Sequence, residues 1–145
     1  MAQQKPSSAS YWRTQGGALE LTTTFNSSGA GTSRIVGNQI FIDVTATLTA
    51  EAAAIAVTCP IDIRVTDVKA IRNGGGNSTL DILNGVGGTS ITGGAMAATA
   101  GDTDLVRATE MDDAAYDVDA GTILSVTCGS ATFLGLIIID FMPTN

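Results

Sequence analysis

Hydrophobic and polar residues alternate along several stretches of the chain with a period of two, which is the period of a β-strand. The clearest case is NQIFIDVTATLTA (38–50), where Ile40, Ile42 and Val44 share one face and Asp43 lies on the other. This pattern predicts a half-buried antiparallel strand. Further strand-like stretches lie at 18–25, 53–60, 61–72, 78–83, 105–111 and 123–128. No segment has a sustained helical period, and the one weak candidate, 109–117, could form a single turn.

Turn residues separate these stretches. NGGGN (73–77) and NG (84–85) predict tight turns, because Asn and Gly adopt positive φ at low cost. Within 61–72 the apolar positions change phase near Thr66 and Asp67. One extra residue in a strand causes such a change, so we expect a β-bulge or a bend there.

The strongest apolar pattern is TFLGLIIIDF (132–141). It is about half the length of a membrane-spanning helix, which needs roughly 20 apolar residues. Its consecutive isoleucines favour a strand, and we expect a closing hairpin with 123–128. Both faces of this strand are apolar, so something must cover the second one: another sheet, the N-terminal segment or another chain. We expect one row to form a subunit interface, namely Phe133, Ile137, Ile139 and Phe141.

About eight short strands with frequent turns predict an all-β fold, an antiparallel β-sandwich of jelly-roll type. A chain of 145 residues forms one domain, for which we expect the bounds 18–145. Residues 1–17 are polar, show no strand period and end on a glycine pair. They are either a loose terminus or an extended N-terminal arm. The arm is favoured because Tyr11 and Trp12, with Arg13 beside them, are typical of partner-binding anchors.

Composition and charge exclude several function classes. The chain is 44% hydrophobic and 14% charged, which excludes a disordered protein. A net charge of −7, with the basic residues scattered, argues against nucleic-acid binding. The N-terminus has no apolar segment behind its positive charge, so we expect no signal peptide.

Catalytic and cofactor-binding patterns are missing from the sequence. The chain has no His, which removes Ser–His and Cys–His nucleophile pairs and the commonest metal ligand. Gly-rich phosphate-binding motifs are absent as well. We therefore expect a protein that is not an enzyme and carries no cofactor.

Half of the 14 carboxylates fall within residues 102–119. A Ca²⁺ site or a glycosidase acid pair would use such residues, but the spacing fits no calcium loop. A solvated acidic face is favoured, with no metal. The seven carboxylates are Asp102, Asp104, Glu110, Asp112, Asp113, Asp117 and Asp119.

The two cysteines, Cys59 and Cys128, end strand-like stretches of similar sequence, AVTCP and SVTCG. A disulfide between them is one possibility. Two buried free thiols are favoured, because no secretory signal is found.

The C-terminal 90 residues or so resemble a family of small virion proteins of tailed bacteriophages, the capsid decoration (cement) and related head proteins. The resemblance lies in an apolar strand (61–72), a Gly-rich turn (73–77), a strand closed by Asn-Gly (80–85), a small-residue loop (91–98), an Arg-Ala-Thr strand followed by DDA (106–116), AGTILSV (120–126) and the last apolar strand (134–141). It implies a jelly-roll-like domain, often a homotrimer, that sits on the capsid surface of the virion and binds the major capsid protein.

An alternative function is a receptor-binding or carbohydrate-binding β-module of a tail fibre or adhesin. Sugar sites usually present aromatic rings. Only 5% of this chain is aromatic, and Tyr11, Trp12 and Tyr116 alone lie outside the strands expected here. The decoration protein is therefore the favoured hypothesis.

Overall fold

The fold is an antiparallel β-sandwich, as the sequence predicts. A computed structural model describes residues 11–15, 18–23, 31–48, 55–75, 77–98, 105–129 and 133–144. These residues contain thirteen strands and no helix. The predicted count of about eight strands is not confirmed. Four of the thirteen strands are only two or three residues long.

The larger of the two sheets has eight strands in the order β1-β2-β3-β4-β13-β6-β10, with β11 also paired to β6. All of its pairs are antiparallel. Its strands are β1 (Tyr11–Gln15), β2 (Ala18–Thr23), β3 (Gly31–Val36), β4 (Gln39–Leu48), β6 (Ile63–Gly75), β10 (Leu105–Arg107), β11 (Asp117–Val118) and β13 (Phe133–Pro143).

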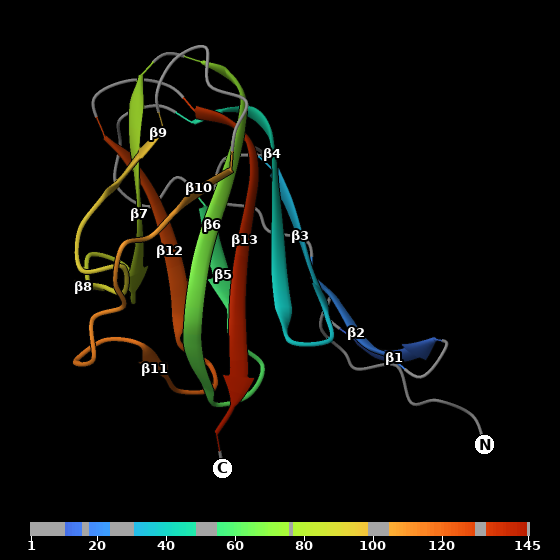
Figure 1. The fold of residues 1–145 in the computed structure, drawn as a ribbon. Helices are drawn as coiled ribbons and strands as arrows, with labels where there is room; N and C mark the ends of the chain where they lie inside the picture. Colours follow the sequence, from blue (N-terminus) through green and yellow to red (C-terminus); the bar gives the residue numbers. More distant parts are fainter. Residues whose placement is uncertain are drawn as a thin grey trace.

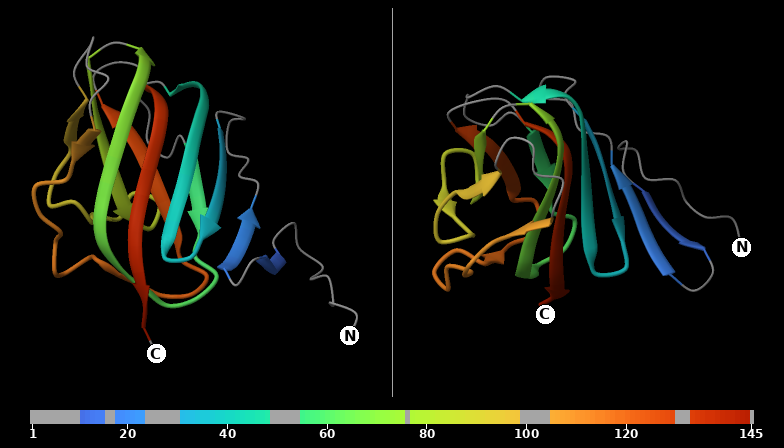
Figure 2. Two further views of the ribbon diagram at one scale, coloured as in Figure 1. Left: turned by 45° about the vertical axis from the view of Figure 1, so that its right-hand side comes forward. Right: turned by 45° about the horizontal axis from the view of Figure 1, so that its top comes forward.

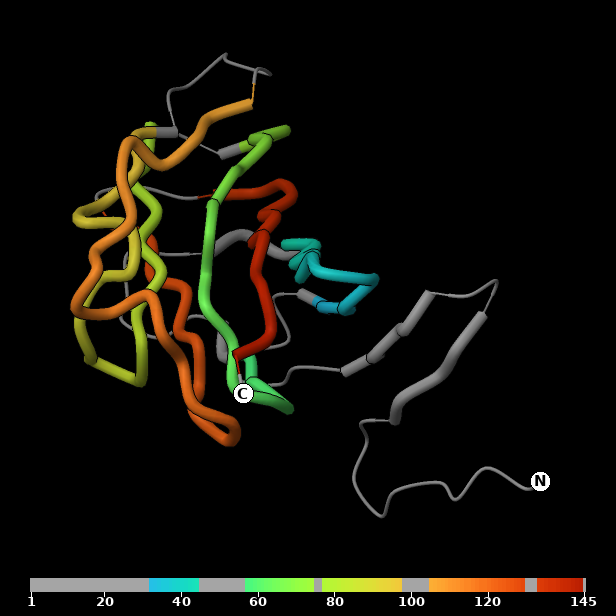
Figure 3. The backbone as a smooth tube through the Cα atoms, turned by 60° about the horizontal axis from the view of Figure 1, so that its bottom comes forward, coloured from blue at the N-terminus to red at the C-terminus, as the bar shows by residue number. Residues whose placement is uncertain are grey.

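The smaller sheet has five strands in the order β5-β12-β7-β8, with β9 also paired to β7. It packs against the larger sheet, and the two layers are visible end-on in Figure 3. Its strands are β5 (Ile55–Thr58), β7 (Ser78–Asn84), β8 (Thr89–Ser90), β9 (Met96–Ala98) and β12 (Ile123–Gly129).

From β4 onward the chain passes back and forth between the two sheets (Figure 1). The last strand, β13, consequently lies between β4 and β6. The expected closing hairpin was wrong: β12 pairs with β5 and β7 in the smaller sheet, while β13 belongs to the larger one. An apolar central strand that faces a second sheet gains more from burial than a strand at the edge of a hairpin.

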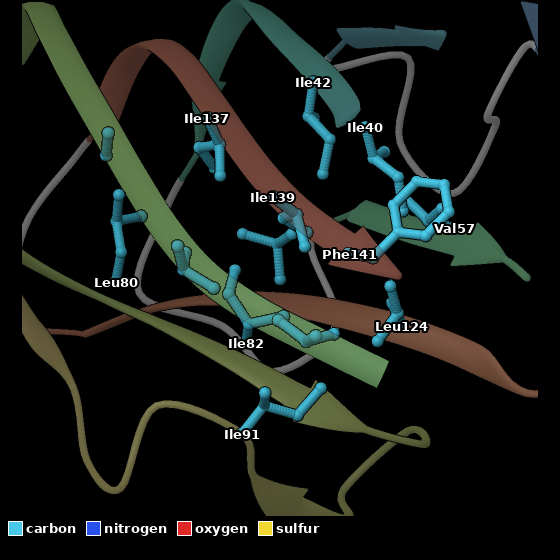
Figure 4. Close-up of a cluster of buried hydrophobic side chains, with 14 of the residues drawn as sticks. Ile40, Ile42, Val57, Leu80, Ile82, Ile91, Leu124, Ile137, Ile139 and Phe141 are labelled. Carbon is cyan, nitrogen blue, oxygen red and sulfur yellow. The ribbon is translucent and has the colours of Figure 1, made fainter. Parts of the chain in front are cut away.

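The core lies between the two sheets and is made of aliphatic side chains (Figure 4). From β13, Ile137 and Ile139 point into it and are fully buried. They meet Leu80 and Ile82 of β7 and Leu124 of β12, which come from the opposite layer. Burying one such side chain contributes about 1.5–3 kcal/mol relative to exposure.

The four residues of β13 predicted to form a subunit interface do not lie on the surface. They are 0–5% exposed within a single chain, so they fill this core and offer no surface to another subunit. These are Phe133, Ile137, Ile139 and Phe141. The opposite row of β13, which includes Leu136 and Ile138, is only partly buried.

The β-bulge expected in 61–72 is confirmed. Asp140 of β13 pairs with Asp67, and the next residue, Phe141, pairs with Val65, so Thr66 is the extra residue of β6. The bulge changes the phase of burial, with Val65 and Val68 both in the core. A second shift lies at Gly135, whose φ of +154° favours glycine.

Strands β1 and β2 extend the larger sheet beyond the smaller one (Figure 2). They form a hairpin in which Trp12 pairs with Leu21 and Arg13 with Glu20. The expectation of no strand within 1–17 was therefore wrong for Tyr11–Gln15. Residues 1–10 and 16–17 lie outside the described residues. The sequence reading also missed β3, since GTSRIV alternates over too few apolar positions.

Candidate interaction surface

The face of the larger sheet that points away from the core is called the outer face here. Two neighbouring rows of residues cross it from β3 to β10, each joined by strand register. Every side chain in both rows is exposed or partly exposed. The Ile138 row contains Arg34, Phe41, Ile138, Lys69 and Arg107, and the Leu136 row contains Thr32, Asp43, Leu136, Ile71 and Leu105.

Apolar side chains occupy the middle of both rows. Ile138 lies opposite Phe41 on one side, and Leu136 lies opposite Ile71 on the other. Leu105 continues the apolar surface onto β10 and is 52% exposed, one of the most exposed large hydrophobic residues of the described chain. An apolar strip of this kind, rimmed by charges, marks a contact surface more often than scattered single residues do.

A network of charged side chains lies next to this strip. Lys69 donates to Asp140 and lies 3.3 Å from a carboxylate oxygen of Asp67. Arg107 donates to the same Asp67 at 2.7 Å through Nε, and Gln39 donates to Asp140 at 2.7 Å. The sequence analysis did not identify these residues, because they come from four strands that are far apart in the chain.

The network shifts the ionisation of its members. Desolvation opposes the charge on Asp67, but the hydrogen bonds from Arg107 and Lys69 outweigh it, so the pKa of Asp67 lies below its usual value. The hydrogen bond to Asp140, helped by that to Asp67, raises the pKa of Lys69. Both groups are therefore charged at neutral pH, and the network is close to electrically neutral.

Arg34 and Asp43 are the two charges of the rows that stand outside this network. The Arg34 guanidinium lies 5.4 Å from the centroid of the Phe41 ring, a cation–π contact. No ion pair or hydrogen bond of a described side chain joins Arg34 or Asp43. Both are exposed.

The described charges are distributed unevenly over the molecule. Apart from Arg72, which is buried, every basic side chain described lies on the outer face: Arg34, Arg64, Lys69 and Arg107. Four carboxylates on the same face balance them: Asp43, Asp67, Asp117 and Asp140. The other described carboxylates lie in loops or on the smaller sheet: Asp62, Asp81, Glu110, Asp112, Asp113 and Asp119. Among the described residues the outer face is thus neutral, while the other described charges are mostly acidic.

The three residues predicted to anchor a partner, Tyr11, Trp12 and Arg13, all lie in β1. Their backbone is described, whereas their side chains lie outside the description. Strand register connects Trp12 through Leu21 to Ile35, a residue of the core. Their role as anchors stays a prediction.

The single turn predicted within 109–117 is present in the acidic segment 102–119. Residues 112–116 form a single turn, in which the Asp112 carbonyl accepts from the amides of Ala115 and Tyr116 at 3.0 and 2.9 Å. The Asp112 carboxylate accepts from the Ala114 amide at 2.9 Å, and Asp117 forms an ion pair with Arg64. The part of the chain that the structure describes holds no cluster of three potential metal ligands. Asp102 and Asp104 lie outside that part.

A cavity of about 470 Å³ lies between the segment after β8 and strand β10. Small residues line much of it, together with Thr92, Met96, Arg107 and Thr109, and no aromatic ring is among the lining residues. A sugar site would be expected to offer such a ring. Tyr116 stacks instead with Arg64, whose guanidinium lies 4.8 Å from the ring centroid.

Cys59 and Cys128 are buried free thiols, as the sequence reading favoured. Burial raises the pKa of Cys59 to about 12 and also raises that of Cys128. Neither is poised as a nucleophile, because the thiolate is the reactive form.

No family model matches the chain, and no similar curated protein or solved structure was found. Among the described residues no helix is long and apolar enough to span a membrane.

Proposed function

We propose that the chain is a structural protein of a virus particle, a capsid decoration protein that binds the outside of the major capsid protein lattice of a tailed phage and stabilises the head. The proposal rests on the resemblance of 61–141 to such proteins and on a fold suited to the task. We further propose that the strand order β4-β13-β6-β10 over β5-β12-β7-β8 is that of a jelly roll.

The observation that carries the proposal is the hairpin of β1 and β2. It adds two strands to a sheet that already covers the smaller one, so it extends past the body of the sandwich (Figures 1 and 2). Because these two strands lie beyond the smaller sheet (Figure 2), they gain stability from another surface to pack on. Strand register joins Trp12 through Leu21 to Ile35 and Ile40 of the core. A partner that packs on the hairpin would therefore continue the core layer beyond the smaller sheet.

Removal of residues 1–15 tests this function. Purified full-length and truncated proteins are mixed with phage heads assembled without the protein, and bound protein is measured after sedimentation. We expect binding to weaken at least tenfold, which corresponds to about 1.4 kcal/mol. Trp12→Ala should account for much of the loss. Equal binding by the truncated protein would exclude the hairpin as the capsid contact, and no binding by the full chain would exclude the decoration role.

The receptor-binding or carbohydrate-binding module stays the second candidate. The cavity beside β10 would be its site, with Arg107 and Thr109 as polar contacts. A glycan array separates the two functions, because only this alternative predicts saturable sugar binding that Thr109→Trp would block.

The resemblance also implies a homotrimer.

A further inference from the structure

We propose that the outer face packs against the outer face of a second copy of this chain, around a two-fold axis that runs across the strands between the Ile138 row and the Leu136 row. The two sandwiches would then stack as four sheets. The two larger sheets would meet in the middle, and the acidic smaller sheets would lie on the outside. This inference does not depend on the capsid function.

The first support is a pair of charges that form no ion pair with any described side chain. Arg34 and Asp43 have opposite signs and lie on the adjacent strands β3 and β4. Arg34 pairs in register with Phe41, and Asp43 is two residues further along β4, so the two charges occupy different rows. A two-fold axis between the rows exchanges them, which brings Arg34 of each copy next to Asp43 of the other.

The second support is the match of the apolar positions on the central strand β13 under the same rotation. Exchanging the two rows places Ile138 over Leu136 of the second copy, and Leu136 over its Ile138. The same exchange places Ile71 over Lys69 and Leu105 over Arg107 of the second copy, so toward β10 the apolar side chains meet the alkyl stems of basic residues. Sheets pack face to face at about 10 Å, which leaves room for these side chains to interdigitate. A surface that matches itself in this manner is what a two-fold contact requires.

The third support is the charge distribution. The chain has a net charge of −7, so two copies repel each other through most of their surfaces. The outer face carries equal numbers of acidic and basic side chains among the described residues, and it is the described surface on which the basic ones gather. Approach through this face therefore avoids the repulsion. A strongly acidic or strongly basic partner would gain less from a neutral face, which favours a second copy as the occupant.

A trimer makes a different use of the surface. Around a three-fold axis each subunit contacts its neighbours through two different patches, and a self-matching face has no special role. The proposal therefore expects the mass of two chains in solution where the resemblance expects three.

The experiment measures the mass of the purified full-length protein by sedimentation equilibrium from 1 to 100 μM, with four variants. Arg34→Asp and Asp43→Arg each place like charges together across the axis, so each should raise the dissociation constant at least tenfold. The double variant R34D/D43R restores opposite charges and the original net charge, and it should return the constant to within threefold of the unchanged protein. Asp113→Arg, an exposed loop residue away from the outer face, is the charge-matched control for Asp43→Arg and should leave the dimer unchanged or tighter.

A fifth variant, Ile138→Thr, tests the apolar part while keeping a β-branched residue in the strand. It should weaken the dimer, and circular dichroism should show the same β-sheet spectrum, so that loss of the fold is not mistaken for loss of the contact. A protein that stays monomeric at 100 μM would overturn the proposal. A mass of three chains, or a dimer that neither single charge reversal affects, would overturn it as well.

Discussion

At the scale of single residues, Gly135 is the position where the backbone leaves least room. A Cβ atom built there would lie 2.1 Å from the carbonyl oxygen of Ile71, far inside van der Waals contact, and the φ of +154° is unfavourable for other residues. Gly135→Ala should therefore lower the free energy of unfolding by about 2 kcal/mol or more, measured by urea denaturation. Gly37→Ala is the matched control, because Gly37 also has positive φ but an added Cβ meets nothing within 4 Å. Equal losses in the two variants would show that strain in φ, and not the clash with β6, decides the cost.

The ion network gives a second prediction at this scale. The pKa of Asp67 is lower in the folded protein than in the unfolded chain, so the folded state binds the Asp67 proton more weakly. Its contribution to stability is complete above the unfolded pKa of about 4 and is lost as pH falls through the folded value. Asp67→Asn should therefore destabilise the protein at pH 7 and much less at pH 2–3, measured as melting temperature against pH. Asp113→Asn, an exposed carboxylate in a loop, serves as control, and parallel pH curves for the unchanged protein and Asp67→Asn would contradict the assignment.

At the scale of strands, the sequence predicts what depends on local alternation and misses what depends on distant partners. The buried face of β4 and the bulge at Thr66 follow from periodicity alone, and both are confirmed. The pairing of β13 does not: a short connection to β12 favours a hairpin locally, but packing places the two strands in different sheets. The core-facing side of β13 was equally ambiguous, because both of its rows are apolar. The outer face could not be foreseen, since its charge network joins Lys69 to Asp140 across half the chain.

The hairpin of β1 and β2 gives a prediction at this scale. Among the described residues β1 pairs only with β2, so its removal breaks no pairing between the strands that carry the core. A protein that lacks residues 1–15 should therefore fold, with the same far-ultraviolet spectrum per residue and a melting temperature within a few degrees of the full chain. A variant without β3, residues 31–36, is the contrasting case, because Ile35 is buried in the core and its loss should abolish cooperative unfolding. A truncated protein that does not fold would place residues 1–15 within the folding unit.

At the scale of the whole molecule, we predict that the acidic segment 102–119 is a solvated face that binds no metal. In the described part of 102–119 the Asp112 carboxylate holds a turn and the Asp117 carboxylate pairs with an arginine, and no three carboxylates come together as ligands. A site with a dissociation constant of 10 μM would stabilise the folded protein by about 2.7 kcal/mol in 1 mM Ca²⁺. For a domain of this size that equals a rise of roughly 5–10 °C in melting temperature. We expect a change below about 1 °C between 1 mM Ca²⁺ and 1 mM EDTA at constant ionic strength, with 1 mM Mg²⁺ as the control for general screening of the net charge. A rise with Ca²⁺ alone would show that Asp102 and Asp104, which the structure does not describe, complete a calcium site, and Asp104→Asn should then remove it.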